Sequence, residues 1–215
     1  MTVPIPTPIY RIIHIDNLLV CLQRGGLYAP NYCPEDGLPY HTIHSEEVQS
    51  GRHITNIPCG PGGTIHDYVP FYFGYLSPML LKLKTGQVAG YTEGQEPILY
   101  LVSTAQAVRD SGAKFVFSNG HGLATFTDWF DGLARLDQVD WDMVYERYWR
   151  DTVDDSDRQR RKQAEFLVRR FCEWSLIREI GVINQAIKTR VEEVFQNHPA
   201  GLRRPVTIKP DWYYY

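Results

Sequence analysis

The sequence predicts an α+β fold built on a mainly antiparallel β-sheet. Short segments rich in β-branched and aromatic residues outnumber segments with helical periodicity, and the two kinds do not alternate along the chain. The chain has 215 residues, of which 43% are hydrophobic and 22% charged, as in a globular domain large enough to bury a core. No repeat or long linker divides it, so we expect a single domain over residues 1–215.

The first half of the chain predicts four strands and one helix. Ile9 to Ile13 is a β-branched run typical of a strand, and Asp16 is placed to cap a helix that stops at the two following glycines. Residues 31–63 are rich in proline, glycine and histidine without a sustained period, which predicts a long irregular segment. The remaining strands are predicted at Tyr68–Phe73, Met79–Leu83 and Ile98–Val102. Pro70 places the first of these at an edge or a bulge.

The second half predicts further strands and helices around one charged segment. Helical patterns cover Ala105–Ser111, Thr127–Leu136, Trp141–Trp149 and Gln185–Gln196. Strands are predicted at Lys114–Phe117, Leu176–Val182 and Val206–Ile208, and Ala164–Arg170 begins a strand or a helix. The charged run Asp151–Lys162 is typical of a solvated loop or helix face.

The charge balance argues against a protein that grips duplex DNA through many phosphates. The formal net charge is −3, with 22 lysines and arginines against 25 acidic residues. If nucleic acid is the substrate, its footprint should be short and depend partly on stacking, for which 14 tyrosines, 9 phenylalanines and 5 tryptophans provide the side chains.

Targeting and metal signals are weak. The amino-terminal residues lack the apolar stretch of a signal peptide, no run reaches the roughly 20 apolar residues of a membrane span, and the four cysteines lack metal-binding spacing. We therefore expect a cytoplasmic protein with reduced thiols. His41 and His44 lie in the irregular segment without a third ligand nearby, so no metal site is expected. Generic phosphate-binding and Rossmann motifs are absent.

Seven blocks of sequence carry a family resemblance. In chain order they are TPIYRIIHIDNL (7–18), HDYVPFYF (66–73), SPML (77–80), GQEPILYLV (94–102), FVFSNGHG (115–122), KQAEFLV (162–168) and IKPDWYY (208–214). Together they resemble the DarT family of DNA ADP-ribosyltransferases, toxins that a macrodomain antitoxin, DarG, neutralises. The resemblance implies an ADP-ribosyltransferase-like split sheet with flanking helices, NAD as co-substrate in the cleft, no metal, and thymidine in single-stranded DNA as acceptor. It also implies a DarG-like partner and a monomeric enzyme.

The resemblance assigns roles to individual residues. Arg52 matches the catalytic arginine and Glu165 the catalytic glutamate. The NAD-contacting positions are Arg11, Ile12, Ile13, Val20, Tyr28 and Arg52. Arg11 stands where many members have histidine, which matters little if this position contacts nicotinamide through its backbone. His121, Tyr72 and Met79 are expected to contact the DNA acceptor. From residue chemistry alone, Tyr72 is equally compatible with a buried strand aromatic, and Met79 is favoured as a core residue.

These residue types fit ADP-ribosyl transfer. Breaking the bond between nicotinamide and ribose develops positive charge on the sugar, which a carboxylate such as Glu165 stabilises. The acceptor base must lose a ring proton, and the family implies that Arg52 assists this step. A guanidinium is normally always protonated. Residue chemistry therefore favours Arg52 as a stabiliser of a base anion or of an NAD phosphate.

Two other functions remain open on the sequence alone. The same fold could ADP-ribosylate protein or RNA instead of DNA. The domain could also be a non-catalytic module that only binds NAD or nucleic acid, although the presence of both Arg52 and Glu165 argues against that.

Overall fold

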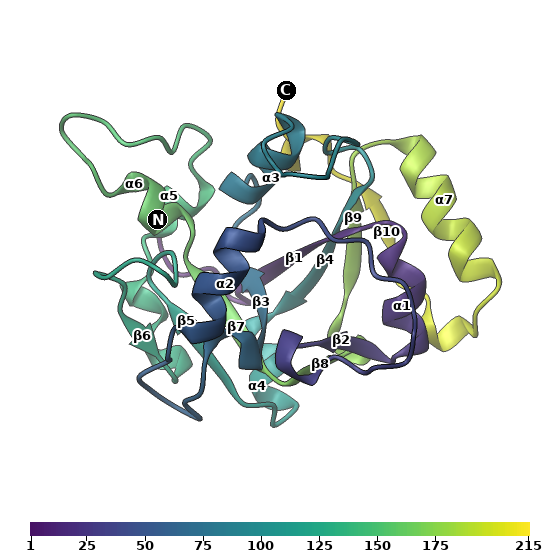
Figure 1. The fold of residues 1–215 in the computed structure, drawn as a ribbon, viewed down its shortest axis with the longest axis horizontal. Helices are drawn as coiled ribbons and strands as arrows, with labels where there is room; N and C mark the ends of the chain where they lie inside the picture. Colours follow the sequence, from purple (N-terminus) through teal and green to yellow (C-terminus); the bar gives the residue numbers. More distant parts are fainter.

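Two antiparallel-rich sheets organise the chain, and the computed structural model describes all 215 residues (Figure 1). The strands are β1 (Pro8–His14), β2 (Gly26–Tyr28), β3 (Tyr68–Tyr72), β4 (Ile98–Thr104), β5 (Phe115–Ser118), β6 (Trp129–Phe130), β7 (Glu165–Arg169), β8 (Phe171–Glu173), β9 (Glu179–Val182) and β10 (Val206–Ile208). The larger sheet has the order β10-β9-β4-β1-β3-β7-β5-β6, with β9 and β10 as its only parallel pair, and β2 pairs with β8. The predicted mainly antiparallel α+β fold is confirmed.

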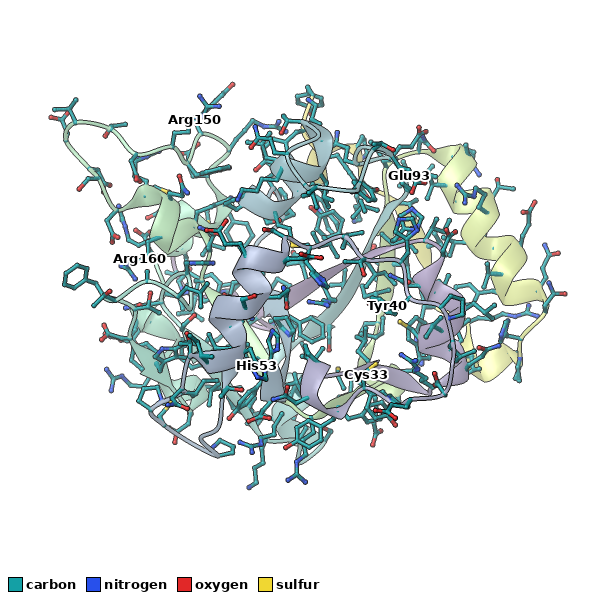
Figure 2. All side chains as sticks on the ribbon, viewed as in Figure 1. Cys33, Tyr40, His53, Glu93, Arg150 and Arg160 are labelled. Carbon is teal, nitrogen blue, oxygen red and sulfur yellow. The ribbon has the colours of Figure 1, made fainter.

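Seven α-helices flank these strands. They are α1 (Asn17–Gln23), α2 (Glu46–Ile54), α3 (Pro78–Lys84), α4 (Ala105–Asp110), α5 (Trp141–Tyr145), α6 (Arg158–Lys162) and α7 (Gln185–Gln196). The segment between β2 and α2 crosses in front of β1 and β4, and Figure 2 shows Cys33 and Tyr40 along it. None of the helices has both the length and the apolar character needed to cross a membrane.

The larger sheet is split between β1 and β3. Strand β1 pairs with β4 along its whole length, from Pro8 to His14, whereas it meets β3 only where Tyr10 lies opposite Tyr72. The N–H of Phe73 donates to the carbonyl of Ala164, the residue before β7 (3.4 Å). Because backbone N–H groups along a strand point alternately to its two sides, the backbone nitrogen of Pro70 faces β1. Pro70 thus lies at an inner edge of the sheet, where its missing N–H leaves no ladder bond unmade.

Strand alternation divides the core between the two sides of the sheet. Ile9 and Ile13 of β1 belong to the largest buried cluster, whereas Tyr10 and Ile12 belong to a second cluster. The two buried clusters therefore pack against opposite faces of the sheet.

Several sequence-predicted elements are wrong or incomplete. Met79–Leu83 is not a strand but part of α3, because Ser77 caps a helix there by accepting a hydrogen bond from the N–H of Leu80, with Pro78 in its first turn. Residues 31–63 are not wholly irregular, since they contain α2. The short pair β2 and β8 has no signal of its own and was missed.

Two of the four helices predicted in the second half are confirmed, Ala105–Ser111 as α4 and Gln185–Gln196 as α7, and the other two are wrong or too long. Thr127–Leu136 contains β6 and the start of a 3₁₀ turn at Leu133–Gln138, and Trp141–Trp149 is helical only as far as Tyr145. The charged run ends in α6. The strand predicted at Leu176–Val182 is restricted to β9, because a 3₁₀ turn occupies Trp174–Leu176. Asp16 occupies the position before α1 but makes no side-chain capping bond.

Candidate active site

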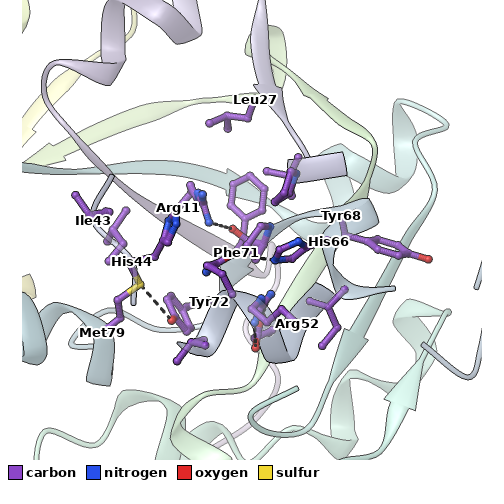
Figure 3. Close-up of a pocket in the computed structure, with 18 of the residues that line it drawn as sticks. Arg11, Leu27, Ile43, His44, Arg52, His66, Tyr68, Phe71, Tyr72 and Met79 are labelled. Carbon is purple, nitrogen blue, oxygen red and sulfur yellow. Dashed lines mark hydrogen bonds and ion pairs between the residues drawn. The ribbon is translucent and has the colours of Figure 1, made fainter. Parts of the chain in front are cut away.

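A cavity of about 460 Å³ opens beside the split between β1 and β3 (Figure 3). Its walls come from β1, α1, β2, the segment before α2, α2 itself, β3 and α3, with residues of the β5–β7 connection at one end. The split between β1 and β3 and the segment between β2 and α2 thus create a pocket of the size that holds small organic ligands.

The cavity gathers nearly all of the residues singled out from the sequence. Those that line it are Arg11, Ile12, Val20, Tyr28, Arg52, Tyr72, Met79, His121 and Glu165. Ile13 is the exception. Its side chain is 1% exposed in the main core and lines no part of the cavity. Any contact between Ile13 and a ligand would therefore have to use its backbone.

Arg52 and Glu165 form a buried bidentate ion pair across the floor of this cavity. Nη1 of Arg52 lies 3.0 Å from Oε1 of Glu165, and Nη2 lies 2.8 Å from Oε2. The two residues are 8% and 2% exposed. Parallel N–H···O bonds of this kind fix both side chains in orientation as well as in charge.

Backbone and hydroxyl groups hold Glu165 from other directions. The N–H of Gly122 donates to Oε1 at 3.3 Å, so this oxygen receives hydrogen bonds from two directions. The N–H of Glu165 itself donates to Ser118 Oγ (3.2 Å), and that hydroxyl donates to the carbonyl of Gly120 (2.7 Å). Because β7 begins at Glu165, the carboxylate stands at a strand end whose position these bonds determine.

The ion pair sets the charges of both groups. Burial alone would raise the pKa of Glu165, but the charge and hydrogen bonds of Arg52 outweigh it, and the pKa lies below its usual value. Burial likewise opposes the charge of Arg52, yet Glu165 raises the pKa of the guanidinium above its ordinary value. The contribution of Glu165 to stability is present above the carboxyl pKa of the unfolded chain and is lost as pH falls through the lowered folded value. Near neutral pH both groups are therefore charged.

The proposed acceptor residues lie around this pair. Tyr72 is directly opposite Glu165 in the β3–β7 register, and its hydroxyl lies 4.0 Å from the Met79 sulfur. Burial and then the charge of Glu165 raise the pKa of Tyr72 to about 12, so its hydroxyl stays protonated. Burial lowers the pKa of His121, which favours a neutral imidazole that can both donate and accept a hydrogen bond.

Several polar cavity residues were assigned no role from the sequence. They include Tyr40, His44, Gln49, His66, Lys82, Gln159 and Gln163. Gln49 lies 3.0 Å from His66 (Oε1 to Nε2) and precedes Arg52 by three residues on α2. Recognition of α2 as a helix would have placed Gln49 and Arg52 on one face.

The site combines an apolar cleft with a fixed buried carboxylate. Such a carboxylate can stabilise a positive charge that develops on a bound ligand, because its partners already hold it in place. Arg11 adds a cation whose Nη1 donates to Pro70 O (3.2 Å), while its buried Nε has no hydrogen-bond acceptor in the protein.

Comparison with known proteins identifies the family. The family model described as ssDNA thymidine ADP-ribosyltransferase, DarT, matches residues 10–214. The chain belongs to the DarT family. A DNA ADP-ribosyl transferase from Thermus sp. (strain 2.9) is 43% identical over 213 residues, covering 99% of both chains. The DNA ADP-ribosyl transferase of Escherichia coli O127:H6 is 33% identical over 207 residues, covering 96% of this chain and 93% of the other.

Solved DarT structures agree with this assignment. Thermus sp. 2.9 DarT in complex with ADP-ribosylated ssDNA superposes with a TM-score of 0.93 at 42% identity, covering 100% of this chain and 99% of the other. The complex of the same protein with NAD⁺ gives a TM-score of 0.87 at 41% identity, covering 99% and 100%. The expected family, the DNA ADP-ribosyltransferase activity and the use of NAD as co-substrate are confirmed.

Proposed function

We propose that this DarT chain transfers ADP-ribose from NAD to a thymine base of single-stranded DNA, with Glu165 and Arg52 as its catalytic pair. The observation that carries the assignment of residues is the bidentate ion pair at the cavity floor. The bond between nicotinamide and ribose breaks with its electron pair leaving on nicotinamide. The ring nitrogen of the base then bonds to the same ribose carbon and releases its proton to solvent water.

Glu165 stabilises the sugar as positive charge develops on it. The carboxylate is ionised and held by Arg52 and Gly122, so little reorganisation is needed when the charge appears. Arg52 acts as the holder of that carboxylate and as a cation near the reacting groups. Its raised pKa makes it a poor acceptor of the proton lost by the base, which favours the electrostatic role over that of a general base.

We assign different lining residues of the cavity to the two substrates. Arg11, Ile12, Val20 and Tyr28 line the cavity and are assigned to NAD. Tyr72, Met79 and His121 lie around Glu165 and are assigned to the base. Ile13 contributes to the NAD site only as part of β1.

The direct test offers competing acceptors to one preparation. The protein is incubated with NAD and single-stranded DNA, and separately with RNA and with a protein mixture, and the gain of mass is followed. ADP-ribose on thymine-containing DNA is expected. Faster modification of RNA or protein would instead favour the alternative activity left open by the sequence.

Single strands are expected to be modified and the matched duplex not. Taking a thymine out of a duplex costs a few kcal/mol, and a chain of net charge −3 has little phosphate attraction to offset this cost. Initial rates on an oligonucleotide with and without its complement measure the difference. Equal rates would show that the cavity acts on paired bases and would contradict this proposal.

Replacing His121 with alanine is expected to lower transfer to DNA at least about tenfold while changing hydrolysis of NAD by water less than about threefold. His121 opens the connection that leads to Glu165, and its backbone is fixed by bonds from its N–H to Arg160 O (2.9 Å) and from Thr127 Oγ1 to its carbonyl (2.8 Å). The side chain can therefore be removed without freeing the loop. Both rates are measured on one preparation, and a parallel fall in the two would place His121 on the NAD side.

The wider setting follows from family membership. We propose that the 215 residues act as a single catalytic domain, that the enzyme is a monomeric cytoplasmic toxin, and that a macrodomain antitoxin reverses or blocks its action. Four free cysteines suit a reducing compartment. Light scattering on the purified protein tests the monomeric state. Treatment of the modified oligonucleotide with a macrodomain hydrolase tests the last.

A further inference from the structure

Two histidines stack on each other beside the NAD end of the cavity. His14 is the last residue of β1, and His41 lies in the segment between β2 and α2. Their rings are 3.8 Å apart between centroids and 20° from parallel, and Tyr91 packs edge-on against both. The side chain of His14 is 1% exposed and that of His41 is 32% exposed. The stacking therefore packs the segment between β2 and α2 against β1 of the sheet.

Carboxylates border both edges of the stacked rings. Asp16 Oδ2 lies 3.3 Å from Nδ1 of His14 and 3.6 Å from Nδ1 of His41. On the opposite edge, the two oxygens of Glu93 lie 3.4 Å from Nε2 of His14 and 3.2 Å from Nε2 of His41. Arg190 of α7, 3.8 Å from the other oxygen of Asp16, is the remaining charged neighbour. Figure 2 labels Glu93 above Tyr40, which is the residue before His41.

The backbone of His41 is fixed independently. Asn17, 0% exposed at the start of α1, accepts from the His41 N–H at 2.7 Å and donates to the His41 carbonyl at 2.8 Å. Immediately around His41, Tyr40, Ile43 and His44 line the cavity. The position of His41 therefore sets the position of one wall of the NAD site.

We propose that His14, His41 and Glu93 form a proton-sensitive clamp that positions this wall for NAD, engaged while His14 is neutral. The inference rests on the proposed use of this cavity for NAD. In the engaged state the Nε2 atoms of both rings face Glu93, and the buried Nε2 of His14 has no other acceptor.

Protonation of His14 would disengage the clamp. Burial, followed by the charge of His41, lowers the pKa of His14, which means that the clamped state favours the neutral ring. A group of this kind supports the clamped state above its ordinary pKa near 6.5 and loses that support as pH falls toward the lowered value. Asp16 and Glu93 at the ring edges favour the charged form, but burial and His41 outweigh them.

The same side chains include a set that could hold a metal ion, namely His14, Asp16 and His41. The stacking argues for a clamp instead. The nitrogen lone pairs of nearly parallel rings point in nearly the same direction and do not converge on one ion. A chelator therefore should not change NAD binding.

Two substitutions of His41 separate the stacking of its ring on His14 from the effect of its charge on His14. His41→Ala removes both and is expected to raise KM for NAD about tenfold at pH near 7.5, with kcat within about twofold. His41→Phe keeps a stacked ring without nitrogens and should stay within about threefold of the wild-type KM. His198→Gln, at the end of α7, is the matched control and should leave KM unchanged.

The pH profile supplies the decisive readout. Between about pH 7.5 and 5.5, KM of the wild type should rise severalfold more than that of His41→Phe, because the variant lacks the charge that lowers the pKa of His14 in the clamped state. Other cavity histidines contribute equally to both profiles. Parallel profiles, or an unchanged KM in His41→Ala, would overturn the clamp. So would loss of NAD binding in chelator with recovery on added Zn²⁺, since that would make the cluster a metal site. Failure of the wild type to use NAD at all would instead reject the proposed function.

Discussion

Replacing Glu165 with alanine is expected to slow ADP-ribosyl transfer by about a thousandfold or more. The carboxylate is the one anionic side chain buried in the cavity floor, and its ion pair and the N–H of Gly122 hold it where positive charge would develop. Removing it withdraws an interaction that matters chiefly in the transition state. Initial rates of mass gain on a single-stranded oligonucleotide measure the effect.

Glu165→Gln provides a stricter version of this experiment. The amide keeps the size of the side chain and loses its charge, so a comparable fall in rate would assign the effect to charge. Both variants leave Arg52 buried without its partner, which is expected to reduce stability by about 3 kcal/mol without unfolding the protein. Glu173→Gln, an exposed carboxylate on β8, is the control. A folded Glu165→Ala protein within about tenfold of the wild-type rate would remove Glu165 from the mechanism.

Local patterns predicted the strands of the sheet well but not the elements that close the cavity. β1 and β4 are β-branched or aromatic runs whose burial is visible from the sequence. α2 is short, polar and follows a proline-rich segment, so its helix depends on tertiary contacts that periodicity does not report. α3 had the sequence signals of a helix, Ser77 and Pro78, yet its apolar residues suggested a strand.

The proposed catalytic pair was accessible only through the resemblance. Arg52 and Glu165 are 113 residues apart, and each on its own is typical of a surface residue. Their pairing requires α2 to pack across the end of β7, a contact that no local pattern encodes. The prediction that groups them in one site agrees with the geometry, whereas the inclusion of Ile13 followed from its place in a matched block and not from the direction of its side chain.

The side chains of the proposed clamp were likewise not predictable as a group from the sequence. The sequence drew attention to His41 and His44, but their spacing offers no third partner. The partners come from elsewhere in the chain, His14 and Asp16 at the end of β1 and Glu93 before β4. Because α1 and the sheet bring these segments together, the cluster exists only in the folded chain.

Replacing Arg52 with alanine is expected to lower transfer by about a hundredfold to a thousandfold near neutral pH and to change the shape of its pH profile. In the wild type the guanidinium keeps the pKa of Glu165 below its ordinary value, so the carboxylate is charged throughout the neutral range. Without Arg52, burial is opposed only by His121 and the N–H of Gly122, and we expect the pKa of Glu165 to rise. The uncharged form then grows as pH falls, and the rate of Arg52→Ala should rise with pH where that of the wild type is flat.

Arg52→Lys tests whether charge or proton transfer is involved. Lysine keeps a positive charge beside Glu165 but loses the bidentate geometry, so we expect a partly restored rate and a pH profile that is flat again. Arg109→Ala, a half-exposed guanidinium paired with Asp110 on α4, controls for general loss of charge. If Arg52→Ala retained the flat wild-type profile at a reduced rate, the carboxylate would not depend on Arg52 for its charge. Arg52 would then have to act directly on the base, as the family resemblance implies, and its assignment as the holder of Glu165 would be wrong.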